Sequence, residues 1–376
     1  MGIAGISGGR LRIDLDAIAA NYRLIARRVG PAEVGAVVKA NAYGLGATEV
    51  AQALYKAGCR LLFVAHLGEA LALRSVLPDE TRLVVLNGLP TGAEPACAKA
   101  AVIPVLNSTE QACRWADTAR QAGTRLPAAL QFDSGMGRLG MAVEDLASLA
   151  ADTGFHAAVD IAMIMSHLAC ADTPEHPANA AQLACFQAAS RLVPGVPHSL
   201  ANSGGAFLPP DFHADIVRAG IALYGGSPNR GGPNPMQPVV GLEGRIIQIR
   251  TVAAGSRVGY GHSHYCERES RIATVGVGYA DGLPRSLGNR GAVWHGGQRL
   301  PIVGRVSMDS ITVDVTTLPA DRIRAGDWVE LIGPHQSIDR FADDAGTISY
   351  EMLTSLGARY DRSYIDQAMG DRGEIA

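Results

Sequence analysis

Short apolar segments alternate with stretches of helical spacing through the first two thirds of the chain. Eight apolar runs occur before about residue 225, and a polar side chain follows each of them. These side chains are, in chain order, Lys39, His66, Asn87, Asn107, Asp133, Ser166 with His167, Asn202 with Ser203, and Arg218. Continuous apolar strands separated by helices indicate a parallel sheet covered on both faces. Eight such units over roughly 200 residues predict an α/β fold that opens with an N-terminal (β/α)8 TIM-like barrel.

The barrel prediction brings these polar side chains together. Residues that follow barrel strands line one mouth, where the active sites of such barrels lie. Leu15, Ile18, Tyr22 and Ile25 have helical spacing behind Asp14, a typical N-cap, which supports an opening helix. An open dinucleotide-binding sheet is less favoured, because the segment KANAYGLG after the first strand lacks the spacing G-x-G-x-x-G.

The pattern changes at about residue 236. Short β-branched runs such as GRIIQIRTV, RIATVGVGY and SITVDV are separated there by Gly, Pro and Asp, which is typical of antiparallel strands. The segment SPNRGGPNP at 227–235 has the composition of a linker. The expected division is therefore a barrel domain at 1–235 and a mostly antiparallel C-terminal β domain at 236–376.

Composition narrows the class of protein. The chain has 376 residues, 47% of them hydrophobic, and a net charge of −3 from 33 basic and 36 acidic residues. This balance is typical of a folded protein and offers no basic tract for nucleic acid. The apolar runs are shorter than a membrane span and the N-terminus lacks the pattern of a signal peptide, so we expect a soluble, cytoplasmic protein. Six cysteines without metal-site spacing predict reduced thiols and no metal.

Lys39 is the first candidate for chemistry. A lysine at a barrel mouth is partly desolvated, which lowers the pKa of its amine and makes the amine available as a nucleophile. Tyr43, four residues later, could offer a hydroxyl to the same site. On position alone, however, an ordinary strand-terminal lysine is the more frequent case.

A second candidate is an anion site. Arg218 is followed by the segment AGIALYGG, whose backbone amides near Gly220 and Ile221 suit a phosphate. Ser203 and the two glycines after it could hold the same anion. Each segment alone is a weak signal, because glycine-rich turns after strands are common.

Nine motifs together resemble one family. They are VVKANAYGLG, DSGMGRLG, SHLACAD, ANSGG, VRAGIALYG, VGYGHS, GYADG, VGRVSMD and ISYE, and they cover essentially the whole chain. Their order and approximate spacing are similar to those of bacterial alanine racemases. The resemblance implies a pyridoxal phosphate (PLP) enzyme of fold type III that interconverts L-alanine and D-alanine for peptidoglycan synthesis or for alanine catabolism.

The resemblance also implies the cofactor contacts. Lys39 holds PLP covalently, and Arg218 faces the pyridine nitrogen without giving it a full proton, since a guanidinium is practically never deprotonated. This restrains electron withdrawal into the ring and so favours racemisation over side reactions. The remaining cofactor-binding residues implied are Tyr43, His167, Asn202, Ser203, Gly220, Ile221 and Tyr350.

Racemisation needs a base on each face of the substrate carbon, because a single base returning its proton on the same face restores the starting isomer. By resemblance the two catalytic residues are Lys39 and Tyr260. In the family this tyrosine comes from the partner subunit of a homodimer and belongs to a hydrogen-bond network. That network includes His167, Arg218 and His198.

Substrate contacts are implied in the same way. Arg138 binds the carboxylate of the substrate with help from the backbone of Met308, and Asp309 orients that segment. The positions that line the family's entry path correspond to Asp172, Tyr279, Arg285 and Arg305. One position departs from the family: Gln131 stands where many relatives carry a carbamylated lysine that braces the arginine. A neutral amide adds no charge there, so we predict that an anion such as chloride fills the gap.

Three alternatives share parts of this plan. PLP-dependent decarboxylases of basic amino acids usually set an acidic residue against the pyridine nitrogen, and Arg218 argues against them. A non-catalytic PLP-binding barrel resembles only the first domain, and the β domain with Tyr260, Met308 and Tyr350 argues against it. A broad-specificity racemase for serine or basic amino acids stays open, because the sequence does not place the side chains that set pocket size.

Overall fold

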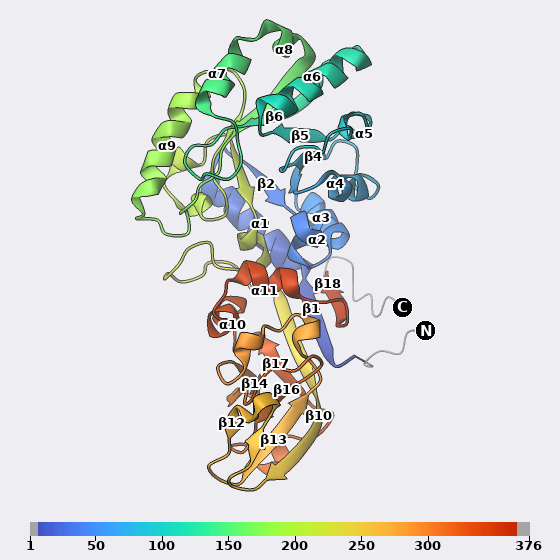
Figure 1. The fold of residues 1–376 in the computed structure, drawn as a ribbon, viewed down its shortest axis with the longest axis vertical. Coiled ribbons are helices and arrows are strands. Elements are labelled where there is room, and N and C mark those ends of the chain that lie inside the picture. Colours follow the sequence, from blue (N-terminus) through green and yellow to red (C-terminus); the bar gives the residue numbers. More distant parts are fainter. Residues whose placement is uncertain (1–6, 367–376) are drawn as a thin grey trace. The chain divides into compact units, whose positions relative to one another are not determined.

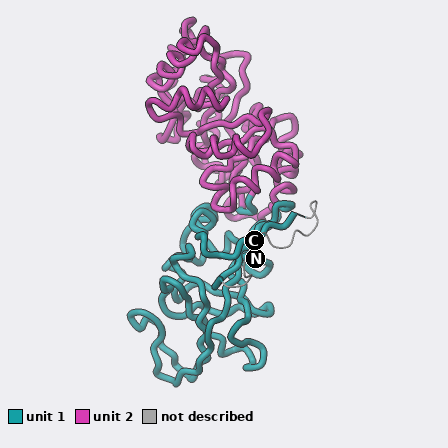
Figure 2. The backbone as a smooth tube through the Cα atoms, turned by 90° about the vertical axis from the view of Figure 1, so that its right-hand side faces the viewer, with its two compact units in different colours: residues 1–17, 224–226, 237–376 teal, residues 18–223, 227–236 magenta. Residues whose placement is uncertain are grey.

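The computed structural model describes residues 7–366, which form two compact units (Figure 2). The barrel unit consists of Ile18–Leu223 and Ser227–Met236. The sheet unit consists of the described residues up to Ala17, Tyr224–Gly226, and the chain from Gln237 onward. Each unit has its own sheet and its own buried residues, so each is described by itself.

Eight parallel strands form the centre of the barrel unit (Figure 1). They are β2 (Glu33–Val37), β3 (Leu61–Val64), β4 (Arg82–Val85), β5 (Ile103–Leu106), β6 (Leu126–Gln131), β7 (Val159–Met165), β8 (His198–Ser199) and β9 (Ile216–Ala219). Each strand pairs with the next from β2 to β8, and β9 pairs with β2. Asp215 N donates to His198 O at 3.0 Å and Arg218 N to Ala201 O at 2.9 Å, which joins β9 to the segment of β8 and closes the ring. The predicted barrel and its eight strands are confirmed.

Helices connect these strands on the outside of the ring (Figure 1). Their bounds are α1 (Leu15–Val29), α2 (Lys39–Tyr43), α3 (Ala47–Lys56), α4 (Leu67–Arg74), α5 (Glu94–Lys99), α6 (Thr109–Ala122), α7 (Val143–Ala151), α8 (Thr153–Ala158) and α9 (Pro177–Ser190). The predicted cap of α1 is present, because Ala17 N donates to Asp14 Oδ1 at 2.8 Å. Ile18 and Ile25 are fully buried, as their spacing predicts.

The sheet unit is mostly antiparallel, as expected for the C-terminal domain. Its main sheet has the order β15, β14, β17, β10, β1, β18; in addition, β13 pairs with β10, and β16 pairs with β13. The bounds are β1 (Gly9–Asp14), β10 (Val240–Val252), β13 (Ser270–Val275), β14 (Ala292–His295), β15 (Gln298–Pro301), β16 (Ile311–Asp314), β17 (Trp328–Ile332) and β18 (Asp361–Ile365), with β11 (Arg257–Val258) and β12 (His264–Tyr265) as a separate pair. Helices α10 (Ile338–Ala345) and α11 (Ser349–Ser355) complete the unit.

The first strand differs from the expected division at 235. Strand β1 pairs with β10 and β18, so it belongs to the sheet unit and not to the barrel. Its burial alternates along the strand: Leu11 and Ile13 are fully buried, whereas Arg10 and Arg12 are exposed. Alternation of this kind is typical of a sheet with one wet face, whereas buried barrel strands are apolar throughout.

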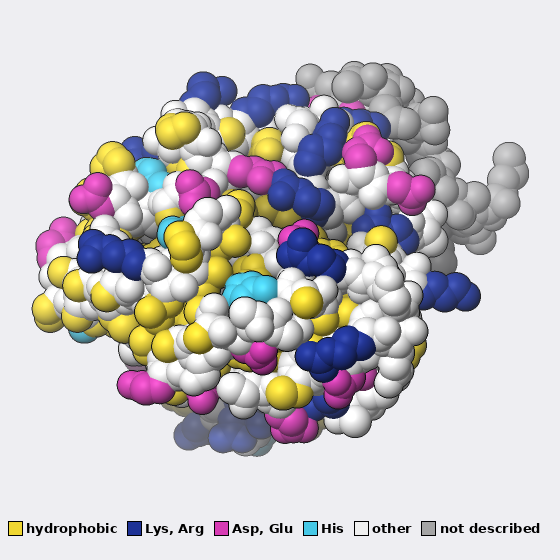
Figure 3. Space-filling view, turned by 90° about the horizontal axis from the view of Figure 1, so that it is seen from above, with side chains coloured by type: hydrophobic (Ala, Val, Ile, Leu, Met, Phe, Trp, Pro, Cys, Tyr) yellow, Lys and Arg dark blue, Asp and Glu magenta, His cyan; other side chains and the backbone are white. Residues whose placement is uncertain are grey.

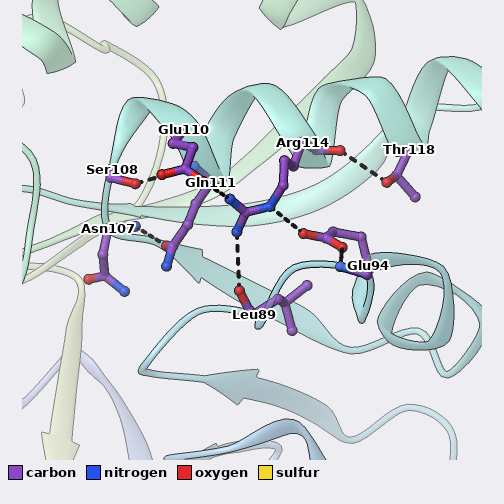
Figure 4. A network of polar contacts seen from close by, with 9 residues as sticks. Leu89, Glu94, Asn107, Ser108, Glu110, Gln111, Arg114 and Thr118 are labelled. Atoms are coloured by element: carbon purple, nitrogen blue, oxygen red, sulfur yellow. Dashed lines mark hydrogen bonds and ion pairs between the residues drawn. The ribbon is translucent and has the colours of Figure 1, made fainter.

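Not every polar side chain at a strand end serves the mouth of the barrel. Asn107, which follows β5, donates to Leu86 O at 3.1 Å, and its backbone amide donates to Gln111 Oε1 at 2.8 Å (Figure 4). On the same helix, Arg114 binds the buried Glu94 at 2.7 Å and Leu89 O at 3.2 Å. These bonds fasten α6 to the ends of β4 and β5, so Asn107 has a structural role.

Basic and acidic side chains are interspersed on the face of the molecule that Figure 3 shows. Among the described residues, no helix combines the length and the apolar composition that crossing a membrane requires. The same part of the chain contains no cluster of three or more His, Cys, Asp or Glu side chains that could hold a metal ion. All six cysteines are unpaired.

Candidate active site

Lys39 follows β2 and begins a strained turn. Ala40, Asn41, Ala42 and Tyr43 all have a positive φ, between 52° and 56°. This left-handed conformation costs roughly 1 to 2 kcal/mol for each residue other than glycine. The turn is closed by Ala42 N donating to Val38 O at 2.9 Å and by Gly44 N donating to Ala40 O at 2.8 Å. Four strained residues in a row at the mouth of a barrel are typical of a functional site.

The Lys39 amine is surrounded by cations. Burial lowers its pKa first, and the positive charges of Arg138 and Arg218 lower it further. The carboxylate of Glu69 acts in the opposite direction. Because the net direction is downward, a larger fraction of the amine is neutral and nucleophilic near neutral pH than in an ordinary lysine. The expected lowering of the pKa is therefore present in this environment.

Arg218, on β9, is 3% exposed and is held by a shell of acceptors. Its Nη1 donates to Ser199 Oγ at 2.6 Å and its Nη2 donates to Ser166 O at 2.7 Å. Burial lowers the pKa of Arg218 to about 10, which still leaves the guanidinium charged at neutral pH. Among the described residues, the hydrogen bonds of Arg218 all use Nη1 or Nη2, so Nε is left for another group.

His167 lies against this guanidinium. Arg218 Nη2 is 3.1 Å from His167 Nδ1, and since arginine is only a donor, Nδ1 must accept. The ring proton is then on Nε2, where it can be donated into the site. Burial and the charges of Arg218, Arg138 and Lys39 lower the pKa of His167 to about 3, so the ring is neutral at pH 7.

His167→Asn should make stability less sensitive to acid. The folded protein resists protonation of this ring down to about pH 3, whereas the unfolded chain takes up the proton near pH 6.5. Stability therefore falls as the pH drops through this window, by at most about 1.4 kcal/mol per pH unit for one proton. Asparagine keeps an acceptor for Arg218 without this titration. Urea unfolding between pH 6.5 and pH 4 should show a shallower slope for the variant, and an unchanged slope would contradict the neutral ring.

An anion cradle lies beside Lys39 and Arg218 in the barrel unit. Ser203 Oγ accepts from the amide of Gly220 at 2.8 Å and from that of Ala222 at 3.3 Å. A Cβ on Gly220 would lie 2.4 Å from Tyr43 Oη, so the absent side chain leaves room for the phenol. Two hydroxyls and the backbone around Gly220 thus converge, as the sequence predicts for a phosphate site.

The loop that carries Arg138 is ordered by its first residue. The amides of Gly135, Met136 and Gly137 all donate to the Asp133 carboxylate at 2.8 to 2.9 Å. Burial opposes the charge of Asp133, but these bonds lower the pKa of the carboxyl below its usual value. Asp133 therefore orders the loop, and the exposed side chain of Arg138 is not needed for that task.

Gln131 braces this loop through its backbone. Its Nε2 donates to Leu139 O at 3.2 Å, one residue beyond Arg138. Within residues 7–366, no hydrogen bond joins Gln131 to the Arg138 guanidinium. The predicted anion between the two side chains stays a prediction.

Three other candidates have contacts of a different kind. Asn202 Oδ1 accepts from Gly205 N at 3.0 Å, which caps the next turn, and Asp172 pairs with Arg230 at 2.6 Å. The rings of His198 and Phe186 pack nearly perpendicular to each other, and Nε2 of His198 is buried without a partner in the described structure. Arg218 thus contacts one of the two histidines in the expected network, His167.

The remaining candidates belong to the sheet unit. Tyr260, on a short helix at Tyr260–His262, is 70% exposed, and Met308, Tyr279 and Tyr350 are exposed as well. Exposed aromatic and methionine side chains are typical of surfaces that meet a partner.

Charged candidates lie in the same unit. Arg285 and Arg305 are exposed, and Asp309 binds Arg359 at 2.6 Å. Arg359 also binds Asp281, whose Oδ2 accepts from Gly278 N. Arg359 thus links Asp309, the residue after Met308, to Asp281, and the orienting role of Asp309 stays a prediction.

Sequence reasoning missed two polar residues that order the mouth of the barrel. Glu69 accepts from the backbone amides of Ala40 and Ala65, which follow the neighbouring strands β2 and β3. Gln182, buried on α9, accepts from Ala169 N at 2.9 Å and donates to His167 O at 2.9 Å, which fixes the backbone around His167. Neither lies in a motif, and both act on segments distant in the sequence.

Comparison with known proteins agrees with this geometry. Residues 13–228 match the family model of the alanine racemase N-terminal domain, and residues 239–364 match that of the C-terminal domain. The chain is 53% identical over 366 residues to a catabolic alanine racemase of Agrobacterium fabrum, covering 97% of this chain and 94% of that protein. It is 50% identical to an alanine racemase of Brucella ovis, covering 96% and 94% of the two chains.

Solved structures extend the likeness to three dimensions. The crystal structure of alanine racemase from Bartonella henselae with covalently bound pyridoxal phosphate has a TM-score of 0.92 and 46% identity, covering 96% of this chain and all of that one. The biosynthetic alanine racemase of Pseudomonas aeruginosa has a TM-score of 0.89 and 37% identity, with the same coverage. The chain, with its barrel, its antiparallel domain and its lysine beside a buried arginine, therefore belongs to the alanine racemase family.

Proposed function

We propose that the protein interconverts L-alanine and D-alanine with PLP as its cofactor. The observation that carries this proposal is that the Lys39 amine, whose pKa burial and nearby cations lower, lies in the same barrel unit as Arg218 and the anion cradle at Ser203. The residues present fit the cofactor in two independent ways. The Tyr43 phenol can lie in the cradle only because Gly220 lacks a side chain, and Arg218 keeps Nε available on a guanidinium whose Nη1 and Nη2 are hydrogen-bonded.

In this proposal Lys39 holds PLP covalently, while Tyr43, Ser203 and the backbone of Gly220 and Ile221 bind its phosphate. Bound PLP acidifies the Cα–H bond of an amino acid attached to it. Arg218 stays charged and gives no proton to the pyridine nitrogen of PLP. The ring therefore withdraws fewer electrons from the substrate carbon than a protonated ring would. Arg138, exposed on its ordered loop, binds the substrate carboxylate.

Proton transfer at Cα is assigned to Lys39 on one face and to Tyr260 of the partner subunit on the other. A homodimer is part of the proposal, because Tyr260, Met308 and Tyr350 are exposed side chains of the sheet unit. The Nε2–H of His167 is available to stabilise a phenolate. We further propose a cytoplasmic location, which suits six unpaired thiols.

A role in alanine breakdown is the physiological part of the proposal. Relatives at 53% and 52% identity, from Agrobacterium fabrum and Rhizobium johnstonii, are named as catabolic alanine racemases. A deletion strain should then lose growth on alanine as the carbon source and should not require D-alanine. A requirement for D-alanine would instead assign the protein to cell-wall synthesis.

The decisive experiment is product analysis. Purified protein with added PLP is incubated separately with L-alanine, L-serine, L-lysine and L-arginine, and the products are separated by chiral chromatography. D-Alanine as the dominant product supports the proposal, whereas comparable yields of other D-amino acids would make the enzyme a broad-specificity racemase. Release of carbon dioxide would overturn the proposal in favour of a decarboxylase.

Gly220→Ala should weaken cofactor binding. The added Cβ would stand 2.4 Å from Tyr43 Oη, so the phenol must leave the cradle. Loss of one charge-assisted hydrogen bond corresponds to an increase in the PLP dissociation constant of about tenfold or more. Equilibrium dialysis of the cofactor-free protein measures this constant. Gly232→Ala is the matched control, since a Cβ at Gly232 meets nothing within 4 Å, and equal affinities of the two variants would contradict the assigned phosphate site.

A further inference from the structure

The turn after Lys39 needs an external support. Its four residues with positive φ are all non-glycine, and Ala40 and Asn41 are exposed to solvent. Its internal bonds, from Ala42 N and Gly44 N, begin only at the fourth residue after Val38. A strained segment persists only where its surroundings over-determine it. The direction in which Lys39 points depends on this turn, because Lys39 is its first residue.

Glu69, on α4, supplies such a support. Its Oε1 accepts from Ala40 N at 2.6 Å. Its Oε2 accepts from Ala65 N at 2.8 Å and from His66 N at 3.0 Å. Ala65 follows β3, the strand that pairs with β2 beside Lys39. One carboxylate thus ties the left-handed turn to the end of the neighbouring strand.

The two oxygens separate two roles. The bonds to Oε2 cap the start of α4, which is an ordinary task for a glutamate in the first turn of a helix. The bond to Oε1 adds nothing to that helix, since Ala40 belongs to the turn after Lys39. Helix capping therefore explains the hydrogen bonds of Oε2, whereas the hydrogen bond of Oε1 serves the turn after Lys39.

We infer that Glu69 is a positioning residue for Lys39, which holds the left-handed turn of Ala40–Tyr43 in place and so directs the amine into the mouth of the barrel. The inference rests on the proposed function only in the task given to Lys39. The groups that face the amine are Arg138 from the loop after β6, His167 from the end of β7, Arg218 from β9, and Glu69 itself. Glu69 is the only acid among these four.

Glu69→Gln separates the two roles. Its single carbonyl oxygen satisfies the two amides at Ala65 and His66, and its NH₂ then faces the amide of Ala40, donor against donor. We expect amide hydrogen exchange at Ala42 and Gly44 in the cofactor-free protein to become about tenfold faster. The PLP dissociation constant should rise by a similar factor. Glu110→Gln is the matched control, because Glu110 also lies in the first turn of a barrel helix and its carboxylate contacts Arg114 on its own helix.

Ala40→Gly tests whether the effect is conformational. Glycine adopts a positive φ without strain, so the double variant Glu69→Gln with Ala40→Gly should regain slow exchange and PLP affinity to within about threefold of Ala40→Gly alone. A double variant that stays as impaired as Glu69→Gln would overturn the inference. So would a Glu69→Gln protein with the exchange rates of the wild type.

The charge of Glu69 gives a third readout. The chain has three lysines, Lys39, Lys56 and Lys99, so acetylation of Lys39 can be followed by mass spectrometry against two internal references. Loss of the carboxylate should lower the pH midpoint of Lys39 acetylation in both the single and the double variant, since the negative charge raises the pKa of this amine. An unshifted midpoint would contradict the proximity of the two groups. Because exchange and acetylation use cofactor-free protein, they test Glu69 even if the wild type fails to bind PLP.

Discussion

Lys39→Ala is expected to abolish alanine racemisation, with a loss of at least about 10⁴-fold. The variant loses both the covalent bond to the cofactor and one of the two bases at Cα. Added PLP should therefore not restore activity. Formation of D-alanine from L-alanine, followed by chiral chromatography, measures the loss. The yellow absorbance of covalently held cofactor should vanish at the same time.

The same variant should be more stable than the wild type when PLP is absent. The Lys39 ammonium is partly buried and is repelled by Arg138 and Arg218, which is the cause of its lowered pKa. Removing a charge that folding disfavours stabilises the native state, as at many active sites where function and stability oppose each other. Urea unfolding of the cofactor-free proteins tests this, with Lys99→Ala at an exposed helix end as the control. Residual racemisation well above the predicted level, or lower stability than the control, would contradict the role assigned to Lys39.

The barrel could be predicted because its information is local. Most of the eight strands are short apolar runs that are largely buried, as β3 and β5 illustrate, whereas β8 has only two residues, His198 and Ser199. Local periodicity also predicted the cap at Asp14 and the helix α1 that follows it. Such features depend on residues a few positions apart, so a single sequence contains them.

The place of β1 could not be predicted in the same way. Its alternation of Leu11 and Ile13 with arginines marks a strand but does not say which sheet it joins. Its partner β10 begins at Val240, more than two hundred residues later. Pairing over such a separation is decided by the packing of the whole unit and has no local signature.

In the candidate site, too, some residues have a local sequence signal and others do not. The sequence places Lys39, His167, Ser203 and Arg218 at strand ends, and a shared barrel mouth then brings them together. Their supports are different, because Glu69 acts on Ala40 across 29 positions and Gln182 on His167 across 15. Positive φ at Ala40 and Ala42 also has no sequence signal, since alanine ordinarily avoids that region.

Tyr260→Phe is expected to slow racemisation by about 10²- to 10⁴-fold, the usual contribution of a positioned acid or base. Both directions of the overall reaction must slow equally, because the two enantiomers of alanine have the same free energy. The asymmetry that identifies a two-base mechanism therefore lies in proton exchange. With Lys39 still present, Cα–H of one enantiomer should continue to exchange with solvent deuterium, whereas exchange of the other should fall with the racemisation rate.

Tyr265→Phe provides the control for that experiment. Tyr265 is also a half-exposed tyrosine of the sheet unit, on β12, and its ring contacts Arg257, a contact that phenylalanine preserves. Loss of a hydroxyl at this position should leave both exchange rates and the PLP absorbance unchanged. If Tyr260→Phe instead slows the exchange of both enantiomers to the same extent, the phenol is not a base for one face of Cα. The exposed Tyr260 would then belong only to a surface that binds a second copy of the chain. The other base must in that case be one of the groups that face Lys39.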